Sequence, residues 1–258
     1  MIFSSPALAD ESWQPDQVSG WPVITQRTAQ PQQQVTSGVE YSSENIQTVS
    51  GRQPVEELDS DLKNPNVSIR TVAADDKVVN PADETVSSMA NRTGSVAGIN
   101  GGFFAINASG EPTDGEIING EIYKSPKNID NASFAVDGSG NVSFAGITFS
   151  GTIADGAQTH SLASINWESD ATGDGITEIT PRLGQVDAQY LGGTRLIVLG
   201  TSNDNGASIK VTSIQTADHL AQLTAGTYGL LSSDAPSAGG AWIRNTVHVG
   251  DTLSMNTK

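Results

Sequence analysis

The sequence predicts an α+β fold, a strand-rich mixed sheet with a few short helices. The chain contains 27 glycines, only 5% of its residues are aromatic, and Ser, Thr, Asn and Asp are abundant, which favours short strands joined by tight turns over a helical bundle. Alternating apolar and polar residues form short runs bounded by glycine turns such as residues 137–140. With 258 residues and 36% apolar content, the chain can bury a sizeable core, as one domain with a tail or as two domains.

Residues 1–9 have features of a signal-peptide remnant. Small residues at Ala7 and Ala9 precede Asp10, as at a signal-peptidase cleavage site. The basic and long apolar parts of a signal peptide are not found upstream, so an ordinary flexible start is the alternative interpretation. A signal remnant would indicate a protein exported from the cell.

Residues 10–38 are predicted to form a flexible linker or an extended arm. The segment contains Pro15, Pro22 and Pro31 and a glutamine-rich patch, and it shows little apolar periodicity. From residue 39 onward the spacing of apolar residues becomes more regular. We therefore expect the folded domain to span residues 39–258.

The first elements of this domain lead into a glycine-rich segment. Alternation over residues 67–73 suits a half-buried strand. Residues 83–91 begin with acidic side chains that complement a helix dipole, and they predict a short helix that ends near Gly94. Residues 96–99 then predict a buried strand, which would place Asn100 at its carboxyl end, beside a cleft.

The second half of the chain has the signals of hairpins and short strands. Glycine-rich turns between alternating runs are the main signal for hairpins. The predicted elements are a hairpin of residues 133–136 with 141–144, a strand at 161–167, a hairpin of 196–199 with 209–214, a helical turn or loop at 218–223, a strand at 228–231, a short helix at 238–244 and a last strand at 247–255.

Charge and composition exclude several classes of partner. The chain has 13 Lys and Arg against 29 Asp and Glu, and a formal net charge of -16 repels nucleic acid at long range. We therefore expect no nucleic-acid partner, and the simplest role of the charge is solubility. Cysteine is absent, which excludes disulfides and thiol chemistry. No apolar stretch approaches the roughly 20 residues needed to cross a bilayer, so the chain is not expected to span a membrane.

The usual metal and nucleotide patterns are also missing. His160, His219 and His248 have no metal-ligand spacing, and we expect no metal and no cofactor. Residues 170–175 partly resemble a calcium loop, but the closing glutamate position is Pro181, which favours a plain acidic turn. Neither a Gly-x-Ser-x-Gly elbow nor a phosphate-binding loop occurs.

Two neighbouring groups of residues remain as candidates for chemistry. Gly101 and Gly102 follow Asn100, and glycines let the backbone approach a phosphate or a sugar hydroxyl closely. Asp114 and Glu116 could supply general acid or base chemistry at a glycosidic bond. The alternative is that the glycines form an ordinary turn and the acids are solvated hairpin residues, which the residues alone favour.

A wider pattern resembles the phosphodiester glycosidase family. Residues 96–104 read Val-Ala-Gly-Ile-Asn-Gly-Gly-Phe-Phe, and Pro112, Gly115 and residues 117–120 follow as in the family signature. The family includes N-acetylglucosamine-1-phosphodiester alpha-N-acetylglucosaminidase, the uncovering enzyme, and bacterial exopolysaccharide biosynthesis proteins. The likeness covers roughly residues 51 to 256 and includes residues 85–90, 165–166, 179–184, 228–232 and 249–251, in the expected order.

The resemblance implies a secreted or cell-envelope-associated glycoside hydrolase. Its substrate would be a sugar-1-phosphodiester bond of a cell-envelope or exopolysaccharide glycan. The sugar-phosphate pocket would be lined by Asn100 and the two glycines, with the phenylalanines anchoring the loop. The resulting assignment is catalytic roles for Asn100, Asp114 and Glu116 and substrate-binding roles for Gly101, Gly102, Phe103, Phe104 and Asn166.

The chain also departs from the family pattern. Family members continue into a Gly-Gly-Gly-Pro segment, an Arg-Thr-Ala segment and a Leu-Asp-Gly-Gly-Gly-Ser segment, and these are absent here. We therefore expect an incomplete, C-terminally truncated phosphodiester glycosidase domain that lacks part of its active site. The alternatives are a non-catalytic glycan-binding or cell-envelope module, and a secreted structural domain with no ligand.

Overall fold

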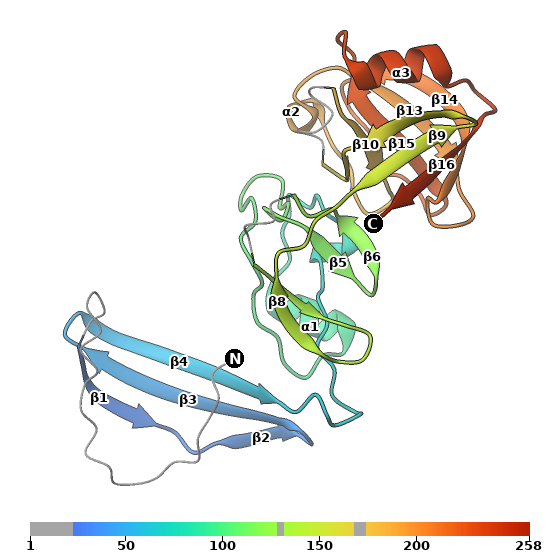
Figure 1. Cartoon of the computed structure of the whole chain (residues 1–258). Coiled ribbons are helices and arrows are strands. Elements are labelled where there is room, and N and C mark those ends of the chain that lie inside the picture. The colour runs from blue at the N-terminus through green and yellow to red at the C-terminus, as the bar shows by residue number, and fades with distance from the viewer. Residues whose placement is uncertain (1–22, 128–131, 168–173) are drawn as a thin grey trace. The chain divides into compact units, whose positions relative to one another are not determined.

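The computed structural model describes residues 23–127, 132–167 and 174–258, and the chain divides into two compact units, Met1–Ser68 and Ile69–Lys258 (Figure 1). The boundary therefore lies thirty residues beyond the predicted domain start at residue 39. The predicted signal remnant lies outside the described residues. So does the first part of the predicted linker, up to residue 22.

The first unit is an antiparallel sheet of four strands: β1 (Ile24–Ala29), β2 (Gln33–Thr36), β3 (Val39–Thr48) and β4 (Gly51–Ser60). β3 pairs with the other three. The described part of the predicted linker thus contains two strands, because main-chain pairing with β3 orders a polar segment that has no apolar periodicity of its own. Within the described part of this unit, Val39 and Thr48 alone are buried.

The second unit contains twelve strands, three α-helices and one short 3-10 helix among its described residues. This content confirms the predicted strand-rich α+β class. The strands are β5 (Glu116–Ile118), β6 (Glu121–Lys124), β7 (Ser133–Val136), β8 (Val142–Ala145), β9 (Gly151–Asp155), β10 (Gln158–Leu162), β11 (Ser164–Ile165), β12 (Ile176–Ile179), β13 (Arg195–Thr201), β14 (Ser208–Ala217), β15 (Thr227–Ser233) and β16 (Thr252–Thr257). The helices are η1 (Ala74–Asp76), α1 (Val86–Thr93), α2 (Ala188–Leu191) and α3 (Ala238–Thr246).

Eight of these strands form one sheet that closes on itself, called here the closed sheet. Its order is β10-β9-β16-β14-β13-β15-β12-β11. The two end strands are consecutive in the chain, separated only by Ala163, whose N–H donates to the carbonyl of Ile176 at 2.8 Å. One bent segment therefore pairs with β9 at its start and with β12 at its end, which closes the sheet.

Apolar side chains fill the interior of the closed sheet, and α3 lies across one end (Figure 1). Every strand of the sheet except the short β11 contributes to this interior, and α3 adds Ile243. The cluster consists of Ile153, Leu162, Ile176, Leu196, Val198, Val211, Leu230, Ile243, Val247 and Leu253. Burying each such side chain stabilises the fold by about 1.5–3 kcal/mol.

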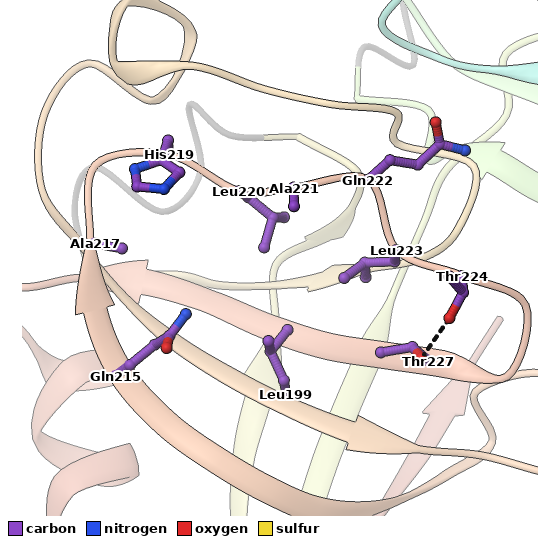
Figure 2. Close-up of a pocket in the computed structure, with 10 residues that line it drawn as sticks. All are labelled: Leu199, Gln215, Ala217, His219, Leu220, Ala221, Gln222, Leu223, Thr224 and Thr227. Carbon is purple, nitrogen blue, oxygen red and sulfur yellow. Dashed lines mark hydrogen bonds between the residues drawn. The ribbon is translucent and has the colours of Figure 1, made fainter.

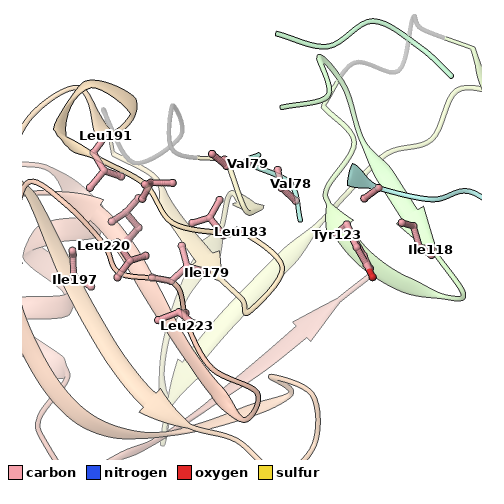
Figure 3. Close-up of a cluster of buried hydrophobic side chains, with 13 residues drawn as sticks. Val78, Val79, Ile118, Tyr123, Ile179, Leu183, Leu191, Ile197, Leu220 and Leu223 are labelled. Atoms are coloured by element: carbon pink, nitrogen blue, oxygen red, sulfur yellow. The ribbon is translucent and has the colours of Figure 1, made fainter. Parts of the chain in front are cut away.

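A second apolar cluster covers the outer side of β12, β13 and β15 (Figure 3). Loop residues such as Leu183 and Leu220 pack there, and Ile118 and Tyr123 join the cluster from the hairpin of β5 and β6. The hairpin that carries the predicted acids is thus anchored to the closed sheet through its buried side chains.

Predictions based on local turn and cap signals are confirmed. The hairpins β7–β8 and β13–β14 and the helix α3 occur as predicted. In α1, the Thr85 side chain accepts the N–H of Ser88 and Gly94 ends the helix with φ 68°.

Several predicted strands differ from the structure. Residues 67–73 and 96–99 form no strand, and Val96 and Ile99 are 63% and 80% exposed. These stretches have apolar residues but no neighbouring strand to pair with, and burial depends on such tertiary partners. The last strand begins only at Thr252 because residues 248–251 form a turn, with Gly250 at φ 101°. Of the two alternatives for residues 218–223, the structure has the loop.

Of the helices in the described ranges, none is both long enough and apolar enough to cross a membrane.

Candidate active site

The hairpin of β5 and β6 is joined to the glycine-rich segment that precedes it. Phe104 and Pro112 form an isolated antiparallel bridge. The N–H and the hydroxyl of Thr113 both donate to the carbonyl of Phe103, at 2.9 and 3.0 Å. The N–H of Ala105 donates to the carbonyl of Glu111 at 2.9 Å. The structure thus brings the end of the segment 100–104 next to the residues that lead into Asp114.

The segment 100–104 is an open, solvent-exposed stretch of backbone. Phe103 is 88% exposed. Gly101 and Gly102 have no positive φ, and a Cβ added to either would meet no atom within 4 Å. Neither backbone strain nor crowding by the protein therefore accounts for the two glycines, and the space in front of their backbone is open to a ligand.

Asp114 is fixed by main-chain hydrogen bonds at the start of the hairpin. The N–H of Gly115 donates to its Oδ1 at 2.8 Å, and the N–H of Lys127 reaches the same atom at 3.5 Å. Gly115 is required here, because an added Cβ would lie 2.5 Å from the Cα of Pro126. The carboxylate of Asp114 is therefore held at the point where residues 126–127 pass close to the backbone of Gly115.

Glu116 opens β5 and pairs across the hairpin with Lys124. Its side chain is half-buried, and burial raises the pKa of its carboxyl to about 7, with the positive charge of Lys124 acting in the opposite direction. A carboxyl with this pKa is present in both protonation states near neutral pH, as a general acid or base requires.

Lys124 is a buried charge that the sequence reasoning did not single out. Only 1% of it is exposed. Its ammonium donates to the carbonyl of Pro112 at 2.6 Å, lies 2.5 Å from Oε1 of Glu111, and sits 3.4 Å from the ring centroid of Trp167. The indole N–H of Trp167 donates to the carbonyl of Ser125 at 2.5 Å and so fixes the ring. These partners are distant from Lys124 in the sequence, so no local sequence pattern predicts that this lysine is buried.

Asn166 lies behind the hairpin. It is fully buried, with φ 55°. Its Nδ2 donates to the carbonyl of Tyr123 at 2.6 Å and to Oγ1 of Thr180 at 2.9 Å, while its Oδ1 accepts the N–H of Thr180 at 3.0 Å. The side chain therefore ties β6 to the closed sheet. The substrate-binding role that the family resemblance assigns to it stays a prediction.

The histidines occupy separate places. The ring of His160 packs 5.8 Å from that of Trp242, His219 lies 3.0 Å from Asp218, and His248 lies beside Asp251. Among the described residues, no three His, Asp or Glu side chains are grouped as metal ligands. Most of the predicted acidic turn at residues 170–175 lies outside the described ranges.

A separate hollow of about 390 Å³ lies on the outer side of the closed sheet (Figure 2). Its floor includes Leu199 and Gln215, and the loop from His219 to Thr224 forms its wall. None of the sequence-predicted site residues lines it. The hollow is therefore distinct from the candidate site at the hairpin.

Comparisons with known proteins give no assignment: no protein-family model, curated protein or solved structure matches this chain.

Proposed function

We propose that this chain is a secreted or cell-envelope-associated glycoside hydrolase acting on a sugar-1-phosphodiester bond of a cell-envelope or exopolysaccharide glycan. The observation that carries the proposal is the half-buried Glu116 carboxyl with a pKa of about 7, in a hairpin joined to the exposed segment 100–104. The resemblance to phosphodiester glycosidases supplies the substrate class.

The proposed reaction uses two carboxyl groups of the hairpin. Asp114, held by the N–H of Gly115, accepts a proton from water as the water oxygen bonds to the anomeric carbon. The bond from that carbon to the bridging oxygen of the phosphodiester breaks, and protonated Glu116 gives its proton to this oxygen of the departing phosphate monoester. The open backbone at Gly101 and Gly102 lets amide N–H groups approach the phosphoryl oxygens.

The test measures release of reducing sugar from the benzyl diester of N-acetylglucosamine 1-phosphate by the full chain. We expect turnover near neutral pH and a loss of about 10²–10⁴-fold on Glu116→Gln, the usual contribution of general acid–base catalysis. The matched control is Glu121→Gln, because this exposed carboxylate lies in the same hairpin and pairs with Arg182 at 2.9 Å. Equal rates for the wild type and Glu116→Gln would overturn the assignment of Glu116.

A non-catalytic glycan-binding module is the second candidate, and the exposure of Phe103 favours it. A phenylalanine that is 88% exposed presents a flat apolar surface on an open segment. This candidate predicts that the chain binds the diester without cleaving it and that Phe103→Ala weakens binding. Calorimetric titration beside the sugar-release assay separates the two functions.

A further inference from the structure

A carboxyl group that the proposed reaction does not use lies inside the closed sheet. Glu178 pairs across β12 and β15 with Leu230, so its side chain shares the inner face with Leu230 and Ile176. The residue is 4% exposed. Within the described ranges, its carboxyl has neither a hydrogen bond nor an ion pair. A buried carboxylate without a partner is strongly disfavoured, so the protonated form is the one this environment accepts.

The loop of residues 202–207, between β13 and β14, covers this carboxyl. A Cβ added to Gly206 would lie 2.4 Å from Oε1 of Glu178 and 2.9 Å from Cδ1 of Tyr228, and Gly206 has φ 89°. The loop backbone is therefore seated directly on the carboxyl, at a position that only glycine fits. Because Thr201 pairs with Thr227, the loop lies at the start of β15, whereas α3 follows the other end of that strand.

Short polar contacts hold the loop in this seat. The N–H of Gly206 donates to Oγ of Ser202 at 2.9 Å, and that hydroxyl donates to Oδ1 of Asp204 at 2.8 Å. The N–H of Ser208 donates to the same carboxylate oxygen at 2.9 Å. Two further hydrogen bonds tie the ends of the loop to its neighbours: the N–H of Ser202 donates to the carbonyl of Gly226 at 2.9 Å, and the N–H of Met255 donates to the carbonyl of Ala207 at 2.8 Å. Residues 203–206 between these two anchors can therefore lift without breaking the pairing of β13 with β15.

We propose that the loop 202–207 is a proton-controlled cover: it seats on neutral Glu178 and lifts when that carboxyl releases its proton to solvent, which opens this end of the closed sheet to water.

The charged groups near this end of the sheet act on Tyr228, which faces Glu178 from β15. They include Asp204 of the loop and Arg182, which makes two 2.9 Å contacts with Glu121 of β6. The pKa of Glu178 itself is shifted by burial, and no cation among the described residues offsets the charge of its ionised form. An ionised Glu178 would therefore be stabilised mainly by hydration of its carboxylate. Burial raises the pKa of Glu178 to about 8, whereas a solvated glutamate titrates near its usual value of about 4.3.

Hydrogen exchange of the loop amides tests the proposal on the full chain. When the lifted state binds one proton fewer, the protection factor of the Gly206 amide falls about tenfold per pH unit between roughly pH 5 and 8, after correction for intrinsic exchange, and levels off above that. Glu178→Gln should remove this slope. Tyr228→Phe should keep it, since the tyrosine is not the titrating group.

Amides of the central strand β13 provide the internal reference, because they exchange through global unfolding. We expect the loop to show lower protection than Ile197 across the pH range. A loop protection independent of pH in the wild-type chain would overturn the proposal. So would a slope that persists in Glu178→Gln, or a loop that opens only together with β13.

Discussion

Replacing Asn166 by alanine should destabilise the fold strongly, because this amide ties the hairpin to the closed sheet. The change removes three hydrogen bonds of 2.6, 2.9 and 3.0 Å and leaves the carbonyl of Tyr123 and the N–H of Thr180 without this partner. Leaving a buried polar group unsatisfied costs about 1–3 kcal/mol each. Alanine at φ 55° adds about 1 kcal/mol of backbone strain. The sum is a loss of about 4 kcal/mol in the free energy of unfolding.

Equilibrium urea unfolding measures this loss, with an unchanged dependence on urea showing that the folded states are comparable. The matched control is Asn119→Ala, at an exposed position in the β5–β6 turn with φ 52°. It carries the backbone strain alone, about 1 kcal/mol. If Asn166→Ala and Asn119→Ala lost the same stability, the interpretation of Asn166 as a clamp would be refuted. Loss of substrate binding at unchanged stability would support the substrate-binding role instead.

Two further substitutions test other parts of the structure. Gly206→Ala should lower the free energy of unfolding by about 3 kcal/mol, through crowding against Glu178 and Tyr228 as well as backbone strain. Gly120→Ala, with φ 80° and open space around the added Cβ, should lose only the strain contribution, and similar losses in thermal unfolding would contradict the packing argument. Lys124→Met should raise the pKa of Glu116 further above its usual range, because the positive charge that lowers it is gone. Carbon NMR titration of the Glu116 carboxyl, with Lys127→Met as control, measures this shift, and an unchanged or lower pKa would show that Lys124 does not act on Glu116.

The elements that sequence reasoning predicted well are those specified locally. Asn-Gly and Asp-Gly turns define the hairpins, and a threonine cap and a glycine stop define α1. The strands of the first unit were not predicted, because these polar segments form strands through pairing with β3. Closure of the eight-stranded sheet was likewise not predictable, since it depends on one bent segment that meets strands far apart in the sequence.

The candidate site shows the same division. The proximity of Asp114 and Glu116 and their link to the segment 100–104 follow from short sequence separations. The buried states of Lys124, Asn166 and Glu178 do not, because each depends on contacts made by distant segments. The local sequence around a polar residue in a strand does not show whether that residue will be buried.

The most direct test of the proposed function is the release of reducing sugar from the benzyl diester of N-acetylglucosamine 1-phosphate at about pH 7, near the pKa of Glu116. The proposal predicts release by the wild-type chain and by Glu121→Gln, and its loss in Glu116→Gln. Binding of the diester with no release of sugar by any of the three proteins would contradict hydrolysis and would assign the chain to glycan binding.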